Sequence, residues 1–245
     1  MPRALLTLQY LGTRYAGWQM QTNAVSVQEV VEKALSGLCG QPIRIEGAGR
    51  TDSGVHANGQ RAHVDIPIDI DERGLILSLN DRLPHDIRLR GVEWVDDTFH
   101  CRFVPSLKTY VYQIWNDTAA DVFLFATHMH IRQKLDVPLM RQSAKALTGH
   151  HDFRSYTVKD PEVASTWRTV HELEIVAVDR AIRITITADG FLRFMVRRIA
   201  GSLVEVGRHK QPSSIVAGAL EPVFGLARWT APPHGLTLQG VRYLP

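Results

Sequence analysis

One polar loop concentrates the residue types that can do chemistry. Residues 47–57 read Gly-Ala-Gly-Arg-Thr-Asp-Ser-Gly-Val-His-Ala, so Arg50, Asp52 and His56 fall close together. Extended stretches flank the loop, which is a setting where a sheet can present a reactive side chain. Asp and Ser are also common in ordinary turns, because their side chains satisfy nearby backbone donors. The density of functional groups makes a catalytic loop centred on Asp52 a second interpretation beside the plain turn.

Several reaction classes fit this loop poorly. A glycosidase needs two cooperating carboxylates, and Asp52 has no obvious acidic partner near it. Metal-dependent hydrolysis needs spaced ligands, whereas His56, His63 and the His-His-Asp run at 150–152 lack such spacing. No elbow motif marks a Ser or Cys nucleophile.

A second group of polar residues lies on an expected helix over residues 191–206. Arg193 and Arg197 are four residues apart and fall on one flank of the helix, whereas Arg198 points elsewhere. Either they are solvated surface charges, or they serve a site. The helix itself is predicted from a stripe of apolar residues at helical spacing: Leu192, Met195, Val196, Ile199, Leu203 and Val206.

An expected strand over residues 108–115 places three notable side chains on one face. Lys108, Tyr110 and Tyr112 alternate with smaller residues. Tyrosine is common on half-buried sheets. An aromatic ring beside a cation can equally stack a nucleobase and hold its phosphate.

The composition is that of a globular protein with a basic balance. The chain has 245 residues, of which 44% are hydrophobic and 22% charged, and a formal net charge of +3. Arginine supplies 22 of the 28 basic residues. Guanidinium groups bind phosphate oxygens in a fork, so this bias favours a nucleic-acid partner, although basic surfaces also occur on proteins that bind none.

The expected elements describe two halves that alternate strands and helices. They predict an α+β protein (mixed α/β) whose two domains, 1–104 and 105–245, form an extended, largely antiparallel sheet flanked by helices. A capping-box sequence, Ser-Val-Gln-Glu at 26–29, opens the first helix. Strands are expected at 3–10, 43–47, 60–66, 87–95, 108–115, 170–178, 181–187 and 236–243, and helices after 26 and at 75–79, 136–147 and 191–206.

The cysteines and the amino-terminal residues predict free thiols and a cytoplasmic location. Cys39 and Cys101 are far apart in sequence and lack paired spacing, which favours free buried thiols. Residues 1–10 lack the basic leader and long apolar stretch of a signal peptide or membrane span. We therefore expect a cytoplasmic protein with no membrane association.

Motifs along nearly the whole chain resemble those of the tRNA pseudouridine synthase A family. The opening segment at 10–19 and Gly-Arg-Thr-Asp-Ser-Gly-Val-His-Ala at 49–57 resemble the first loop and the catalytic signature of the family. Cys101, where a small residue such as Ala is usual, and Tyr156, where Phe is common, depart from the pattern. Further pieces follow in family order at 79–87, 99–103, 108–112, 149–153, 190–197 and 232–236.

The resemblance implies an isomerase that converts uridine to pseudouridine at positions 38, 39 or 40, in the anticodon stem-loop of tRNA. It implies Asp52 as the catalytic nucleophile, Tyr110 as the tyrosine packed on the target base and Arg197 as the partner of Asp52. Arg50 resembles the arginine linked to base extrusion. A homodimer and no cofactor or metal are also implied. Lys108, Arg14, His56 and Arg198 are further candidates for contacts with RNA.

The implied reaction agrees with the chemistry of these residue types. It breaks the bond from ribose C1′ to uracil N1 and joins C1′ to C5 with no net oxidation, so it requires neither a redox group nor a metal. A carboxylate beside a guanidinium stays ionised at neutral pH. Whether Asp52 attacks C1′ or C6, or acts through a glycal, stays open. The alternatives are a catalytically inactive tRNA-binding protein on the same scaffold and an aspartate-dependent hydrolase of nucleosides or sugars.

Overall fold

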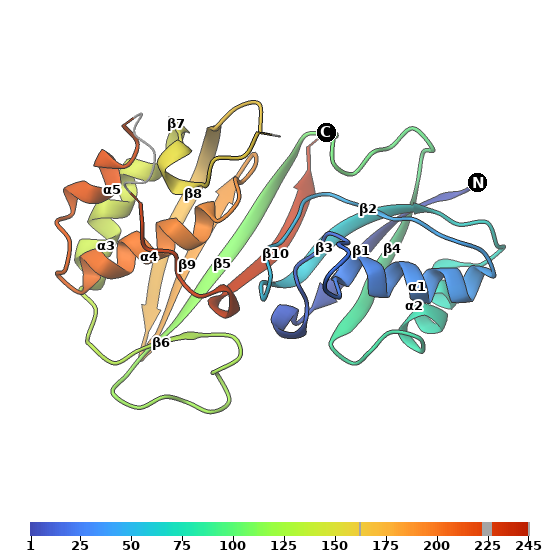
Figure 1. Cartoon of the computed structure of the whole chain (residues 1–245), viewed down its shortest axis with the longest axis horizontal. Helices are drawn as coiled ribbons and strands as arrows, with labels where there is room; N and C mark the ends of the chain where they lie inside the picture. Colours follow the sequence, from blue (N-terminus) through green and yellow to red (C-terminus); the bar gives the residue numbers. More distant parts are fainter. Residues whose placement is uncertain (162, 222–226, 245) are drawn as a thin grey trace. The chain divides into compact units, whose positions relative to one another are not determined.

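The computed structural model describes residues 1–161, 163–221 and 227–244, which form two compact units (Figure 1). The first unit comprises Met1–Ser106 and Leu238–Pro245, and the second comprises Leu107–Thr237. Most of the last strand therefore belongs to the unit that contains the amino terminus. In the division predicted from the sequence, at residues 104 and 105, that strand belongs to the second domain, and this division stays a prediction.

The first unit is built on a sheet with the strand order β4-β1-β3-β10 and a short β2 beside β3. Strand β1 runs antiparallel to both of its neighbours. Its central place explains its near-continuous burial, with Ala4, Leu6 and Leu8 all fully buried. The strands are β1 (Arg3–Tyr10), β2 (Glu46–Gly47), β3 (His56–Asp65), β4 (Ile87–Val95) and β10 (Leu236–Tyr243).

Two capped helices lie together beside this sheet (Figure 1). Helix α1 (Val27–Cys39) begins as the capping box predicts, because the Ser26 side chain accepts a hydrogen bond from the Glu29 N–H at 3.2 Å. Helix α2 (Glu72–Asn80) is capped in the same way by Asp71.

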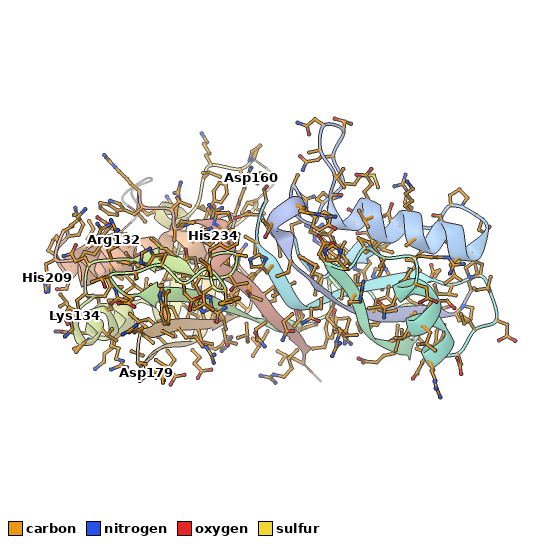
Figure 2. All side chains as sticks on the ribbon, turned by 90° about the horizontal axis from the view of Figure 1, so that it is seen from below. Arg132, Lys134, Asp160, Asp179, His209 and His234 are labelled. Atoms are coloured by element: carbon orange, nitrogen blue, oxygen red, sulfur yellow. The ribbon has the colours of Figure 1, made fainter. Side chains whose placement is uncertain are left out.

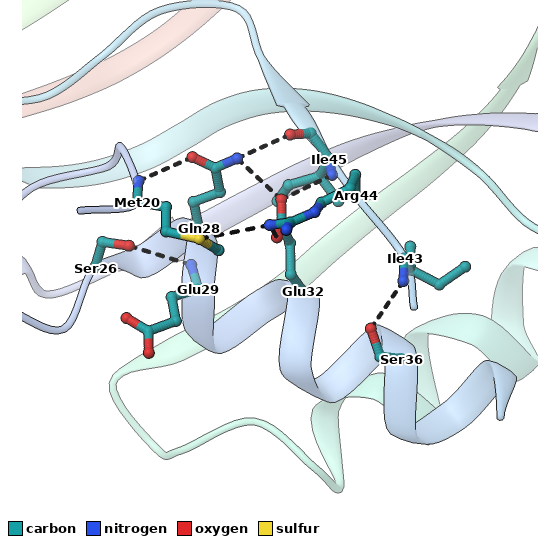
Figure 3. A network of polar contacts seen from close by, with 9 residues as sticks. All are labelled: Met20, Ser26, Gln28, Glu29, Glu32, Ser36, Ile43, Arg44 and Ile45. Carbon is teal, nitrogen blue, oxygen red and sulfur yellow. Dashed lines mark hydrogen bonds and ion pairs between the residues drawn. The ribbon is translucent and has the colours of Figure 1, made fainter. Parts of the chain in front are cut away.

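A buried carboxylate joins α1 to the chain that follows it (Figure 3). Glu32 is 4% exposed and accepts hydrogen bonds from Gln28, from the Ile45 N–H and from Arg44. Gln28 in turn accepts from the Met20 N–H at 3.0 Å. Figure 3 shows that this network ties α1 to both the segment before it and the segment after it.

Cys101 belongs to a small apolar cluster on the first unit. It is fully buried with Leu5 and Ala48. Its thiol donates to the Glu46 carbonyl at 3.0 Å and lies 3.2 Å from Nδ1 of His63. The second cysteine, Cys39, is half-buried, so only one of the two thiols is buried as expected.

The second unit contains a sheet with the order β5-β9-β8-β7 and a short β6 that runs parallel to β5. The pairs β5–β9, β8–β9 and β7–β8 are antiparallel. The strands are β5 (Ser106–Asn116), β6 (Met129–Ile131), β7 (Gly149–Asp152), β8 (Trp167–Val178) and β9 (Ala181–Ala188).

Three helices of the second unit pack on one another, and α3 also contacts β8 (Figure 1). They are α3 (Val137–Ala144), α4 (Met195–Gly207) and α5 (Ser214–Gly218). Polar side chains such as those of Arg132, Lys134 and His209 lie on the exposed outside of the unit (Figure 2). Among the described residues, none of the helices has the length and apolar character needed to cross a bilayer.

The structure confirms the α+β class and the largely antiparallel pairing, and it corrects several elements. The helix expected over residues 191–206 begins only at Met195, because Phe194 adopts the left-handed backbone conformation with φ 65°. Arg193 therefore lies outside the helix. The extended stretch at 43–47 forms a strand only at its last two residues, and β6, β7 and α5 were not predicted.

Candidate active site

Asp52 stands at the start of a tight turn that leads into β3. The Val55 N–H donates to the Asp52 carbonyl at 3.1 Å, and Gly54 within the turn has φ 78°. Glycine adopts this conformation without steric cost. The Asp52 side chain is half-buried, whereas the neighbouring Thr51 is buried and Arg50 is exposed. The turn therefore presents a carboxylate from a fixed backbone.

The segment 10–19 fixes the backbone on both sides of Asp52. The Trp18 N–H donates to the Thr51 carbonyl at 3.1 Å, and the Gly54 N–H donates to the Tyr15 carbonyl at 3.2 Å. The Ser53 hydroxyl donates to that same carbonyl at 3.3 Å. The two segments that resemble the family motifs thus contact each other directly.

Two glycines permit this close approach. A Cβ atom on Gly12 would lie 2.0 Å from the Val55 carbonyl oxygen, and one on Gly17 would lie 2.5 Å from that of Thr51. Real Cβ atoms essentially never come so close to another atom. Only glycine at both positions allows the two backbones to lie in contact.

His56 is placed where it holds the loop. The residue is 2% exposed, and its Nδ1 accepts a hydrogen bond from the Gly12 N–H at 2.8 Å. A neutral imidazole that accepts at Nδ1 carries its proton on Nε2. This burial favours a role in positioning the loop, while the contact with RNA expected from the sequence stays a prediction.

Buried polar groups support the other end of the loop. Gln60 is fully buried and donates to the Gly49 carbonyl at 2.9 Å. The Tyr10 hydroxyl lies 2.9 Å from the Thr51 hydroxyl. Burial raises the pKa of Tyr10 far above its ordinary value, so the phenol stays neutral at physiological pH.

Asp86 connects the segment 10–19 to the start of β4. It accepts a hydrogen bond from the Tyr15 hydroxyl at 2.7 Å and forms an ion pair with Arg14 Nε at 3.0 Å. Burial, together with the hydrogen bond to Asp86 and its negative charge, raises the pKa of Tyr15 to about 12. Tyr15 therefore remains a hydrogen-bond donor throughout the physiological range. Arg14 keeps 60% of its side chain exposed.

Tyr110 lies on β5 in the second unit and is 8% exposed. Its ring meets the ring of Phe191 edge-on, with centroids 5.0 Å apart and an interplanar angle of 84°. Lys108, two residues earlier on the same strand, is half-buried. Because alternate residues of a strand share a face, Lys108 and Tyr110 lie on the same side of the sheet.

Arg197 is held on the first turn of α4. Its Nε donates to the Ala231 carbonyl at 2.8 Å, and the Ala231 N–H donates to the Arg197 carbonyl at 3.0 Å. The guanidinium carbon lies 5.1 Å from the centroid of the Phe194 ring, and that of Arg193 lies 4.9 Å from it. The half-buried Arg197 side chain thus has a defined direction.

Arg198 makes hydrogen bonds to main-chain carbonyls within the second unit. Its Nη1 donates to the carbonyls of Ser155 and Thr157, at 3.1 and 2.5 Å. Burial lowers the pKa of this guanidinium, although it remains charged. These contacts account for its position as a link between α4 and residues 155–157, and its contact with phosphate stays a prediction.

Several residues that build the site had no role predicted from the sequence. Tyr15, Trp18, Gln60 and Asp86 are buried polar or aromatic residues around the Asp52 loop. Tyr15, Trp18 and Asp86 lie within the motif segments at 10–19 and 79–87, and their place in those segments is the sequence signal that could have indicated a role for them. Their partners are distant in sequence, and the pairing of Tyr15 with Asp86 spans 71 positions.

The first unit defines the class of protein. A half-buried carboxylate on a glycine-bearing turn, fixed on both sides by buried backbone hydrogen bonds, is typical of an enzyme with a carboxylate-centred active site. Within the first unit the structure gathers Arg14, Arg50, Asp52 and His56 around the segment 10–19 and the loop that follows β2.

Comparisons with known proteins identify the family. A family described as tRNA pseudouridine synthase matches residues 7–104 and 143–244. The tRNA pseudouridine synthase A of Aeromonas hydrophila is 40% identical over 98% of this chain and 90% of its own length. Those of Ruminiclostridium cellulolyticum and Brevibacillus brevis are 39% and 40% identical, over 99% of this chain and 100% of their own lengths. The chain belongs to the tRNA pseudouridine synthase A family.

Proposed function

We propose that this chain converts uridine to pseudouridine in the anticodon stem-loop of tRNA, at positions 38, 39 or 40. The geometry around Asp52 is the observation that carries the proposal, because two family motifs 30 or more positions apart meet there through four backbone-anchored hydrogen bonds. A protein that only bound tRNA would gain nothing from a carboxylate that faces a phosphate-rich ligand.

The reaction that we propose is an isomerisation. The C1′–N1 bond of the nucleotide breaks, the uracil turns, and a C1′–C5 bond forms. N1 then takes up a proton and C5 releases one, so that atoms and electrons balance. Asp52 acts as the nucleophile or as the base in this sequence. The structure supports this role because Asp52 is half-buried and its backbone is fixed by residues 15 and 18.

The roles of Tyr110 and Arg197 extend the proposal to the second unit. We propose that Tyr110 packs on the target uracil and that Arg197 pairs with Asp52 and keeps it ionised. The edge contact with Phe191 gives the Tyr110 ring a fixed orientation. The hydrogen bond from Arg197 to Ala231 restrains the guanidinium in the same way.

Contacts with the RNA are proposed for five residues, namely Arg50, Arg14, Lys108, Arg198 and His56. Arg50 is exposed directly beside the catalytic turn, which suits a side chain that replaces a flipped base in the stack. Arg14, Lys108 and Arg198 are proposed to contact phosphates and His56 to contact the RNA. Arg198 and His56 also make internal hydrogen bonds, to the Ser155 carbonyl and from the Gly12 N–H. A cytoplasmic homodimer completes the proposal.

The test is the release of tritium from tRNA that carries uracil labelled at C5. Wild type should release tritium, whereas Asp52→Ala and Asp52→Asn should release none above background while they still bind tRNA in a filter assay. The exposed Asp69, changed to Asn, is the matched control and should keep wild-type turnover. Binding by wild type without release would instead indicate an inactive tRNA-binding protein, and turnover by Asp52→Ala would refute the assignment.

A further inference from the structure

We infer that Asp86 is a positioning residue for the proposed reaction. Its single carboxylate holds Arg14 directly and holds the Asp52 loop through Tyr15. The inference rests on the proposed function, since it assigns the residue that keeps the catalytic turn in place. The role assigned to Asp86 requires no contact with the substrate. Asp86 acts through Tyr15 and Arg14.

The two oxygens of the carboxylate have different partners. Oδ1 accepts from the Tyr15 hydroxyl at 2.7 Å, and Oδ2 forms an ion pair with Arg14 Nε at 3.0 Å. The Asp86 main-chain carbonyl also accepts from the Leu11 N–H at 3.0 Å. Asp86 therefore fixes the segment 11–15 at three points along its length.

The contact reaches Asp52 through the main chain of Tyr15. The Tyr15 carbonyl accepts from the Gly54 N–H and from the Ser53 hydroxyl, the two residues that follow Asp52. Tyr15 is 4% exposed, so its ring and its carbonyl belong to one closely packed unit. A shift of the ring would displace the acceptor to which the catalytic turn is bound.

The presence of a carboxylate at this buried position indicates a functional role for Asp86 and not only a role in packing. Asp86 has only 6% of its side chain exposed, and burial of a charge costs free energy unless strong partners satisfy it. A neutral amide or a water molecule would satisfy the Tyr15 hydroxyl. The charge is needed for Arg14, whose side chain is 60% exposed and is our candidate for a phosphate contact. One group thus orients an RNA-binding arginine and the catalytic turn together.

The test measures kcat and KM by steady-state tritium release and separates the contact of Asp86 with Tyr15 from its contact with Arg14. Tyr15→Phe removes one hydroxyl and should lower kcat about tenfold, with KM for tRNA little changed, because misplacement of a reacting group acts on the chemical step. Arg14→Gln should raise KM, since it loses a proposed phosphate contact. Asp86→Ala should change both constants. Asp86→Asn keeps an oxygen acceptor for Tyr15 and should recover part of the kcat loss.

The second readout is whether the effects of two substitutions on kcat add up in the double variant. The double variant of Tyr15→Phe with Asp86→Ala should have the same kcat as Asp86→Ala alone, because both changes break one contact. The exposed Asp81, changed to Asn, is the matched control and should keep both constants. If Asp86→Ala does not fold, Tyr15→Phe and Asp86→Asn decide the question.

The outcomes distinguish this inference from the proposed function. Wild-type kcat and KM in folded Tyr15→Phe and Asp86→Asn, with only a lower melting temperature, would overturn the positioning role and leave the proposed function intact. No tritium release by wild type, or undiminished release by Asp52→Ala, would overturn the proposed function itself.

Discussion

Gly17 and Thr51 approach so closely that a Cβ atom on the glycine would lie 2.5 Å from the Thr51 carbonyl oxygen. Gly17 also has φ 95°, in the region that favours glycine. The proposed nucleophile is the next residue after Thr51, so this contact sets where the Asp52 backbone lies. The fit of two main chains therefore determines the position of the reactive carboxylate.

Gly17→Ala should lower kcat for tritium release by about tenfold or more, because the loop must shift to admit the methyl group. Gly40→Ala is the matched control. Gly40 has φ 69° but open space around its Cβ position, so the change should cost about 1 kcal/mol of stability and leave turnover unchanged. Wild-type kcat in a folded Gly17→Ala protein would contradict this account of the loop.

Tyr110→Phe should retain most activity, whereas Tyr110→Ala should lower kcat/KM about 10- to 100-fold. Base stacking on an aromatic ring contributes about 1–3 kcal/mol, and phenylalanine keeps the ring. Tyr112→Phe on the same strand is the control. It loses the hydrogen bond to the Pro232 carbonyl and should cost about 1 kcal/mol of stability with no change in turnover. Equal losses in both Tyr110 variants would favour a role for the hydroxyl.

Phe194→Gly should separate stability from activity. Phe194 has φ 65°, a conformation that costs roughly 1 kcal/mol for a bulky residue and nothing for glycine. The change relieves this strain but removes the ring beside the Arg197 guanidinium. We expect a melting temperature within a few degrees of wild type and a kcat reduced about tenfold. Asp179→Gly relieves a similar φ of 54° in an exposed turn and should keep full activity (Figure 2).

His63 should make the first unit less stable in mild acid. Burial, assisted by the charges of His100 and Arg3, lowers the pKa of His63 below its ordinary value of 6.5. The unfolded chain therefore binds more protons than the folded chain below about pH 6.5, so stability is full above that pH and falls as the pH drops toward the folded-state pKa.

Thermal melts between pH 8 and pH 5 test this prediction. His63→Asn, which keeps a polar atom near the Cys101 thiol, should flatten the loss of melting temperature on acidification. The exposed His85, changed to Asn, should not alter the pH dependence. A His63→Asn curve parallel to that of wild type would show that the loss arises elsewhere.

Local patterns in the sequence determined much of the secondary structure and the location of the chemistry. Strands β1, β4 and β10 have the predicted bounds, because their apolar patterns and flanking turns are local signals. The capping box placed the start of α1 for the same reason. The motif at 49–57 predicted Asp52 as the reactive residue, because such a motif is formed by residues that are adjacent in sequence.

Only the tertiary structure decided how these residues are held. The start of α4 depends on the left-handed backbone at Phe194, which no helical periodicity reveals. Short strands such as β6 and β7 form because distant partners provide their hydrogen bonds. The contact of His56 with Gly12 and that of Asp86 with Tyr15 each join residues more than 40 positions apart, so the sequence did not predict them. Such pairings follow from the packing of the whole unit, and a local pattern carries no information about them.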